Sequence, residues 1–378
     1  MNLVIYNINS FGGNYEYSKY IFQAYAKHQD ITNCLMLMPR NAELEEANVR
    51  KILLPDIISS KRKWVKRIYY IYRSLVNPFR LFNFLRKYPS SIVLFNDFDQ
   101  LTAFFWVPFF FLLNKRHHFA LVLHDPDRDN FFPVKLLSKL TMQSIMSIMD
   151  VGFYHGFLPA KNYYNNKALK ISVPMGLFAE NSNVDKDFCL RLDELSANNS
   201  LIGILGNIRP EKNYEMVIDS LQKLDNVKLL VAGKAARSSI SVDYYKRYAE
   251  DKNVSDRIIW VEDYLSQTSF NAAIQCCEII LLYYKPSFTS QSAVLSSIAP
   301  FFKKLIISNV DSSLKHSVQR FGLGDIIPHD DPDSFVKSVN KLLHTSGDKY
   351  RQAWKSYMED SSWEMHVNIA VSSFKKVI

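Results

Sequence analysis

Short, mainly apolar runs recur along this chain, and the segments between them leave room for helices. In the first half these runs are Leu3–Ile8, Cys34–Met38, Ser91–Phe95, Phe119–Leu123, Val151–Tyr154 and Lys170–Val173. Runs of this length suit strands that are buried on both faces, and Tyr15–His28 has the helical spacing expected between two of them. Strands that alternate with helices are joined by right-handed crossovers, so we predict a mostly parallel sheet.

The same pattern begins again after a polar region at about residues 180–200. Its predicted strands are Leu201–Leu205, Lys228–Ala232, Ile258–Val261, Glu278–Tyr283 and Leu305–Ile307. Its predicted helices are Tyr214–Leu224, Gln267–Cys276 and Ser292–Ala299. The 378 residues also exceed what one hydrophobic core usually supports. We therefore predict an α/β chain with two Rossmann-like domains, residues 1–176 and 177–362, whose parallel sheets face a cleft. A last helix, residues 363–378, is expected to pack back on the N-terminal domain.

All the excess positive charge lies in the first half of the chain. Residues 1–180 contain 22 Lys and Arg against 13 Asp and Glu, whereas residues 181–378 contain 24 of each. Lys61–Arg73 interleaves basic residues with Trp and Tyr, which suits a helix on an anionic membrane surface. A solvated basic helix is the alternative. The same composition also suits single-stranded nucleic acid, but no nucleic-acid partner is expected.

The apolar segment Leu101–Leu113 is too short to cross a membrane, because its 13 residues fall below the roughly 20 of a spanning helix. We predict a buried crossover helix there, with an interfacial helix as the alternative. The four cysteines are scattered and too few for a disulfide scaffold, and the chain does not begin like a signal peptide. We expect a cytoplasmic protein or, if Lys61–Arg73 binds lipid, a peripheral protein on the inner face of the cell membrane.

A glycine-containing turn follows the strand that ends at Leu205. Gly206 and Asn207 let a ligand approach the backbone closely, and Arg209 and Lys212 follow at the start of a helix. Fixed positive charge beside exposed helix N–H groups favours a bound phosphate. A solvated basic turn is the alternative.

This turn carries a resemblance to family 4 and related GT-B glycosyltransferases. The family pattern is a strand, then Gly and Glu-Lys-Asn, then a helix and a strand that ends in Ala-Gly. This chain has Gly206, then Glu211-Lys212-Asn213, and later Ala232-Gly233. The resemblance implies a two-domain GT-B fold, and it implies that Arg209 and Lys212 contact the diphosphate of a nucleotide-sugar donor. Preset cations of this kind stabilise the charge that accumulates on the leaving diphosphate.

A second motif departs from the family pattern. The resemblance places Thr289 and Ser297 where the family usually has two glutamates, and residues 289–295 are similar to a Thr-Gln-Ser-Gly variant of the family. The residues expected near the donor are Thr289, Ser290, Gln291, Ser292 and Ser297. Hydroxyl and backbone donors before a helix suit phosphate and sugar. Ordinary helix capping is the alternative.

Two further elements of the N-terminal half are candidates for the site. His124 and Asp125 follow a strand at the edge where ligands bind in such sheets, and the resemblance implies a catalytic role near the donor sugar or the acceptor. Asp127–Asp129 is expected to be a solvated loop. Gly12, Gly13 and Asn14 form a turn before a helix, which suits donor or acceptor binding or an ordinary tight turn.

The resemblance implies sugar transfer from a nucleotide-sugar to a saccharide acceptor, lipid-linked and belonging to a surface polysaccharide, with retention of anomeric configuration. No cofactor and no metal are expected, the nucleotide-sugar being a co-substrate. Two alternatives stay open. One is a non-catalytic GT-B protein that binds saccharide or membrane, which the absent glutamates favour. The other is a nucleotide-sugar epimerase of the same fold.

Overall fold

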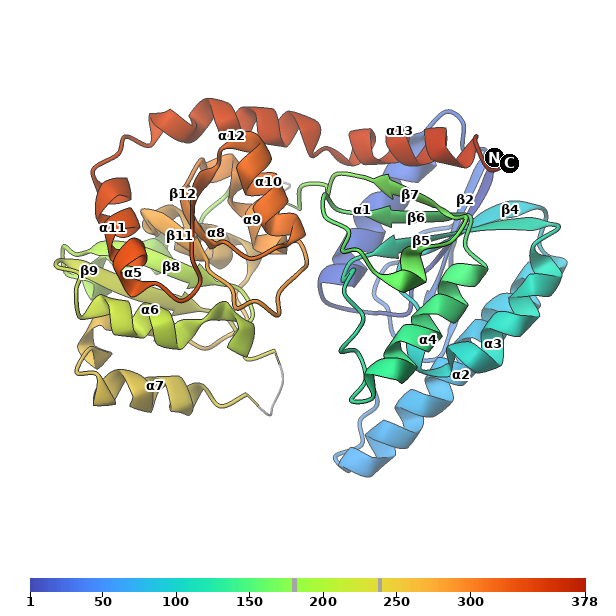
Figure 1. Cartoon of the computed structure of the whole chain (residues 1–378), viewed down its shortest axis with the longest axis horizontal. Helices are drawn as coiled ribbons and strands as arrows, with labels where there is room; N and C mark the ends of the chain where they lie inside the picture. Colours follow the sequence, from blue (N-terminus) through green and yellow to red (C-terminus); the bar gives the residue numbers. More distant parts are fainter. Residues whose placement is uncertain (179–181, 237–239) are drawn as a thin grey trace. The chain divides into compact units, whose positions relative to one another are not determined.

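The computed structural model describes residues 1–178, 182–236 and 240–378, and the chain divides into two units (Figure 1). Unit 1 comprises Met1–Gly176 with Ser361–Ile378, and unit 2 comprises Leu177–Asp360. Each unit contains one sheet in which every pair of neighbouring strands is parallel. Unit 2 is therefore inserted between the main part of unit 1 and its last helix.

The sheet of unit 1 has the order β3-β2-β1-β4-β5-β6-β7. Its strands are β1 (Asn2–Tyr6), β2 (Asn33–Pro39), β3 (Val49–Leu53), β4 (Ser91–Phe95), β5 (His117–Leu123), β6 (Val151–Tyr154) and β7 (Leu169–Ser172). Every residue of the central strand β4 is buried, and its neighbours β1 and β5 are each buried at all but one residue, because helices cover both faces of the sheet.

The helices of unit 1 form two layers, one on each face of the sheet (Figure 1). Its helices are α1 (Gly13–Lys27), α2 (Lys63–Lys87), α3 (Ala103–Phe110), α4 (Lys135–Ser147) and α13 (Trp363–Phe374). Three-residue 3₁₀ turns lie at η1 (Gln100–Thr102), η2 (Phe111–Leu113) and η3 (Asn162–Tyr164). One layer contains α2, α3 and α4, and the other contains α1 and α13 (Figure 1). Among the described residues, no helix is both long and apolar enough to cross a bilayer.

The segment Leu101–Leu113 corrects the prediction of a buried helix. It forms the end of η1, then α3 and η2, and its inner face packs through Trp106 and Phe110. Its outer face is exposed, with Phe105 and Leu112 at 66% and 74% of their full exposure. The segment is apolar on both its inner and its outer face, but only the inner face is packed in the core of unit 1.

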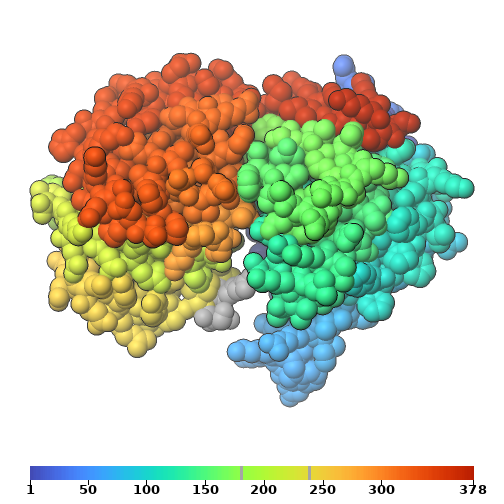
Figure 2. Space-filling view, in the orientation of Figure 1, coloured from blue at the N-terminus to red at the C-terminus, as the bar shows by residue number. Residues whose placement is uncertain are grey.

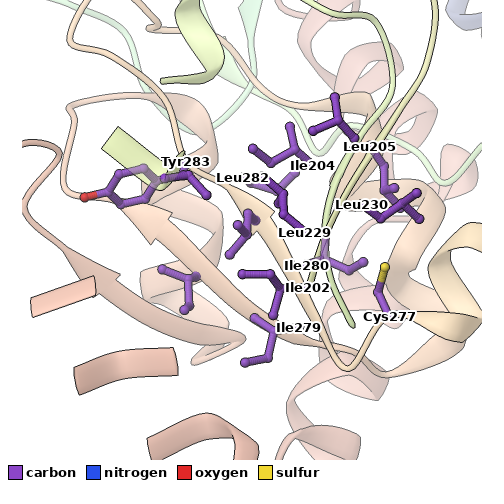
Figure 3. Packing of buried hydrophobic residues seen from close by; sticks show 14 of the residues in the cluster. Ile202, Ile204, Leu205, Leu229, Leu230, Cys277, Ile279, Ile280, Leu282 and Tyr283 are labelled. Atoms are coloured by element: carbon purple, nitrogen blue, oxygen red, sulfur yellow. The ribbon is translucent and has the colours of Figure 1, made fainter. Parts of the chain in front are cut away.

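The sheet of unit 2 has the order β10-β9-β8-β11-β12-β13. Its strands are β8 (Ser200–Leu205), β9 (Val227–Ala232), β10 (Ile258–Val261), β11 (Ile279–Leu282), β12 (Lys304–Ser308) and β13 (Gly324–Ile327). Figure 3 shows the core round β8, β9 and β11, in which Ile202, Leu229 and Ile280 are completely buried.

Helices flank the sheet of unit 2, and α6, α7 and α11 pack side by side. The helices are α5 (Lys186–Ser196), α6 (Tyr214–Leu221), α7 (Val242–Asp251), α8 (Gln267–Cys276), α9 (Ala293–Ile298), α10 (Ser313–Phe321), α11 (Pro332–Leu343) and α12 (Asp348–Asp360). Its 3₁₀ turns are η4 (Pro210–Lys212), η5 (Ser255–Arg257) and η6 (Ala299–Phe301). The polar region near residues 180–200 contains α5, which Asp185 caps by accepting the backbone N–H of Phe188 at 3.1 Å.

Candidate functional site

The turn after β8 brings the ends of two neighbouring strands into close contact. Gly206 has a φ of +82° and Gly233, just after β9, has a φ of +148°. A Cβ on Gly233 would lie 2.4 Å from the carbonyl oxygen of Gly206, which is far inside van der Waals contact. Both the left-handed backbone and the close approach require glycine at position 233.

Lys212 lies directly beneath this turn. Its Nζ donates to the carbonyl oxygens of Leu205 at 2.5 Å and Gly206 at 3.0 Å, and only 6% of the residue is exposed. Burial, together with the nearby charge of Arg209, lowers the pKa of Lys212 to about 7. Among the described residues no carboxylate pairs with this lysine, and a bound phosphate would supply an anion beside it.

Arg209 and Asn207 are exposed on the outer side of the same turn. Arg209 occupies the N-cap position of η4, which ends at Lys212. Asn213 follows in the left-handed conformation, and its side-chain amide donates to the carbonyl of His329 at 2.7 Å, which anchors the start of α6. Gly206, Asn207, Arg209 and Lys212 are therefore brought together, with one cation buried and the other exposed.

The turn between β11 and α9 lies against the turn after β8. A Cβ on Gly206 would stand 3.1 Å from Cγ2 of Val294, at the first turn of α9. The backbone N–H of Lys285 also donates to the carbonyl of Glu211 at 2.7 Å. The predicted second motif is thus adjacent to the Gly206 turn.

The side chains of this second motif make contacts within the protein. The side-chain amide of Gln291 donates to Oγ of Ser317 at 2.7 Å, and Ser292 Oγ lies 3.2 Å from the hydroxyl of Tyr284. Ser297 donates to the carbonyl of Ala293 at 3.3 Å. Thr289 and Ser290 are half-buried, and their carbonyls accept the backbone N–H groups of α10 residues 313 and 314. The α9 N-cap residue Ser292 makes no side-chain capping bond, whereas Oε1 of Gln291 accepts the backbone N–H of Ser292 at 3.0 Å.

In unit 1, four adjacent strands each end at a polar residue. Asn7 follows β1, Asn96 follows β4, His124 follows β5 and His155 follows β6. Asn96 donates to the carbonyl of Asn14 at 2.9 Å, which directs its Oδ1 to accept from Nε2 of His124 at 3.3 Å. Burial lowers the pKa of His124, while Asp97 and Asp125 act in the opposite direction. His124 is therefore a neutral, oriented hydrogen-bonding group, half-buried at the carboxyl edge of the sheet.

The Gly12-Gly13 turn lies at the same edge. Gly12 occupies the N-cap position of α1. A Cβ added to Gly12 or to Gly13 would have no heavy atom of the protein within 4 Å beyond the neighbouring residues. Asn14 donates to Oδ2 of Asp97 at 2.9 Å, so the turn is tied to the end of β4 and to His124 through Asn96.

The segment after His124 corrects the prediction of a solvated loop at Asp127–Asp129. Arg128 is buried and stacks on Phe98 and Phe131, with its guanidinium carbon 5.1 and 5.2 Å from the ring centres. Asp127 and Asp129 both pair with Lys161, at 2.9 and 2.8 Å. These contacts fix the backbone that carries the exposed Asp125, whose carbonyl accepts Nε of Arg128 at 2.9 Å.

Aromatic and histidine side chains surround His124 in a way that the sequence did not predict. The ring of Tyr17 lies edge-on to His124 at 4.6 Å, and its hydroxyl donates to Nε2 of His366, 3.3 Å away. His366 Nδ1 donates in turn to the carbonyl of Pro174 at 2.8 Å, and burial lowers the pKa of His366 to about 4. His155 could have been found, since it follows a predicted strand, but nothing in the sequence relates the late residue His366 to this edge.

Chemically, unit 2 offers a buried lysine, an exposed arginine and an open turn for an anion, and unit 1 offers neutral hydrogen-bonding groups for hydroxyls. Across residues 1–178, 182–236 and 240–378, His, Cys, Asp and Glu do not gather in groups of three or more that could hold a metal ion.

Comparison with known proteins agrees with this architecture. No known family model matches the chain. The D-inositol 3-phosphate glycosyltransferases of Mycobacterium ulcerans and Mycobacterium marinum are each 19% identical over 183 residues, 47% of this chain. The match covers 39% and 38% of these relatives, so it spans about two fifths of their length.

Solved structures match over the whole chain. A UDP-forming trehalose-phosphate synthase from Burkholderia xenovorans has a TM-score of 0.69 at 11% identity and 99% coverage of both chains. The sucrose-phosphate synthase of Thermosynechococcus elongatus has a TM-score of 0.69 at 12% identity, covering 100% of this chain and 98% of its own. The chain therefore has the GT-B fold, with two Rossmann-like domains that each contain one parallel sheet.

Proposed function

We propose that this protein is a glycosyltransferase that moves a sugar from a nucleotide-sugar donor to a hydroxyl of a saccharide acceptor. The observation that carries the proposal is the burial of Lys212 beneath the open turn at Gly206, with Arg209 beside it. The likeness to sugar-phosphate synthases and to the two inositol-phosphate glycosyltransferases supports it.

In this proposal the donor diphosphate binds at the turn after β8. Phosphate oxygens accept hydrogen bonds from Arg209 and from the exposed backbone N–H of Asn207, since the N–H of Gly206 already donates to the carbonyl of Ala232 at 2.9 Å. Lys212 supplies charge from below. As the bond to the sugar breaks, negative charge grows on the diphosphate, and the two cations stabilise it without reorganisation. The turn Thr289–Ser292 would contribute hydroxyl and backbone donors at its side.

His124 is proposed to bind a sugar hydroxyl rather than to transfer a proton. Its Nε2 hydrogen is engaged by Asn96, and its lowered pKa keeps the ring neutral at physiological pH. The exposed carboxylate of Asp125 is proposed to contact the acceptor, on a backbone fixed by Arg128. Gly12, Gly13 and Asn14 would line the same edge.

The acceptor is proposed to be a lipid-linked saccharide of a surface polysaccharide, and the sugar is proposed to be transferred with retention. The solved neighbours favour a phosphorylated sugar as a second acceptor class, because one trehalose-phosphate synthase from Burkholderia xenovorans was solved with glucose-6-phosphate. Incubation with each acceptor class and NMR of the product anomer would decide both points.

A ligand screen tests the central proposal. UDP, GDP, ADP and their common sugar conjugates should raise the unfolding temperature if one of them binds the turn. Arg209→Ala and Lys212→Met should each weaken the binding of that ligand and lower turnover by about a hundredfold or more. Lys228→Ala is the matched control, since Lys228 also bonds a carbonyl, that of Leu195 at 2.8 Å, but lies near the amino end of β9. The proposal fails if no nucleotide is bound or if the control variant loses as much as the other two.

A non-catalytic binding protein is the second candidate. It is favoured by Thr289 and Ser297 at the positions where glutamates are usual, and by the internal hydrogen bond of Ser297. Such a protein would bind saccharide without turnover, and its binding would survive Arg209→Ala with Lys212→Met.

A further inference from the structure

An extended apolar surface of unit 1 is exposed on the outer side of the layer formed by α2, α3 and α4. On α3 and η2, Phe105, Phe109 and Leu112 are spaced by four and three residues and point away from the packed residues Trp106 and Phe110. Phe109 also contacts Phe79 and Phe82 of α2, at ring distances of 5.0 and 5.9 Å. The exposed side of α3 is therefore continuous with the neighbouring helix.

The first turns of α2 continue this surface beyond the sheet. Trp64, Ile68 and Ile71 follow the same helical spacing, and Trp64 and Ile68 are 58% and 59% exposed. Figure 1 shows this end of α2 extending away from the rest of unit 1, and Figure 2 shows it as a projecting pale-blue lobe. On the other side of α3, the exposed Leu136 and Leu140 of α4 belong to the same apolar surface. We call this set of residues on α2, α3 and α4 the apolar helix face.

The charge round the apolar helix face is almost entirely positive. Residues 57–124 contain 11 Lys and Arg against two acidic residues, Asp97 and Asp99, a difference equal to the net charge of +9 of the whole chain. Asp99 is buried. The amphipathic start of α2 places Lys63, Lys66 and Arg67 beside its apolar stripe.

We propose that the apolar helix face binds the surface of an anionic lipid bilayer. Exposed Phe, Leu and Ile gain by entering the boundary of the acyl chains, Trp64 and the tyrosines of α2 suit the headgroup level, and the basic residues neutralise anionic headgroups. A projecting helix end fits a deformable surface, and the exposed Leu112, Leu136 and Leu140 among the aromatic residues favour acyl chains over stacked bases. This extends the predicted segment Lys61–Arg73 to three helices, and it does not depend on the proposed sugar transfer.

Vesicle sedimentation tests the proposal with the full chain and no donor or acceptor present. Wild-type protein should bind phosphatidylcholine vesicles containing about a third phosphatidylglycerol, and should bind pure phosphatidylcholine at least about tenfold more weakly. Replacing Lys63, Lys66 and Arg67 with Gln should weaken binding to the anionic vesicles by about a hundredfold, or about fivefold per residue. Phe105→Ser with Leu112→Ser should weaken binding to both kinds of vesicle, by about tenfold or more.

Matched controls and a local probe make the result decisive. Leu190→Ser in unit 2 removes an exposed leucine (62% exposed) from another surface and should leave vesicle binding unchanged. Trp64 fluorescence, obtained as the difference between wild type and Trp64→Phe, should shift to shorter wavelength when anionic vesicles are added. The proposal is overturned by equal binding to neutral vesicles, by equal loss in the control, or by an unchanged Trp64 signal. It is also overturned if Phe105→Ser with Leu112→Ser abolishes self-association or RNA binding while vesicle binding persists.

Discussion

The buried ammonium of Lys212 makes a quantitative prediction about ligand binding. Burial moves its pKa from 10.5 to about 7, which corresponds to roughly 5 kcal/mol at about 1.4 kcal/mol for each tenfold change in proton affinity. In the free protein at pH 8, the side chain is therefore about nine-tenths neutral. A diphosphate beside it would favour the charged form and raise the pKa again, by roughly two units for an opposite charge at close range.

Binding of the nucleoside diphosphate that the ligand screen selects, taken here as UDP, should therefore take up a proton. With a bound-state pKa near 9, about 0.8 proton per protein should be taken up at pH 8, where the phosphates of UDP are already ionised. Isothermal titration in HEPES and in Tris, which differ in ionisation enthalpy, measures this number directly. Because binding takes up a proton, the affinity for UDP should fall as pH rises, by about twentyfold between pH 7 and pH 9.

Lys212→Met separates this effect from all other titrations. The variant should bind UDP more weakly, without proton uptake at pH 8, and with almost no change in affinity between pH 7 and pH 9. Lys228→Ala should behave as wild type. Equal proton uptake by wild type and Lys212→Met would refute the assignment, and so would wild-type UDP binding that takes up no proton.

Three further predictions concern stability and metal dependence. Gly233→Ala should destabilise unit 2 by about 3 kcal/mol or more in urea unfolding because its Cβ meets the Gly206 carbonyl; Gly322→Ala, with a φ of +68° but open space round it, should cost only about 1 kcal/mol. The pKa of His366 is lower in the folded protein than in the unfolded chain. The contribution of neutral, buried His366 to the stability of unit 1 should therefore be fully present above about pH 6.5. Roughly 3 kcal/mol of the free energy of unfolding should be lost as pH falls toward 4, and His366→Gln should reduce that dependence. Turnover should survive EDTA, since the basic turn is proposed to stabilise the leaving diphosphate, and loss of turnover restored by Mg²⁺ would contradict this.

Strands with an apolar run were predictable from the sequence, whereas two of the edge strands, β3 and β13, were not. β4 and β6 inside their sheet and β10 at an edge begin and end at the predicted residues, because each is an uninterrupted apolar run. β3 lies at one edge of its sheet and includes Arg50 and Lys51, and every residue of the edge strand β13 is partly exposed. An edge strand has solvent on one side, so it needs no continuous apolar run.

The candidate site divides in a similar way. The residues of the Gly206 turn and His124 are adjacent to predicted strands, and the sequence places them at the carboxyl edge of a sheet. Lys212 is buried because its Nζ donates to the carbonyls of Leu205 and Gly206. The spacing of residues in the sequence does not reveal these contacts. The contact of Tyr17 with His366 spans 349 positions, so only the folded chain can show it.

The insertion of unit 2 into unit 1 has a consequence for synthesis on the ribosome. Residues 361–378 are made after residues 177–360, so unit 1 cannot acquire α13 before the whole sequence of unit 2 has been synthesised. Until then Tyr20 lacks the stacked ring of Trp363, and Tyr17 lacks its hydrogen bond to His366. Residues 1–176 are thus made before unit 2, but the unit to which they belong cannot be completed until after it.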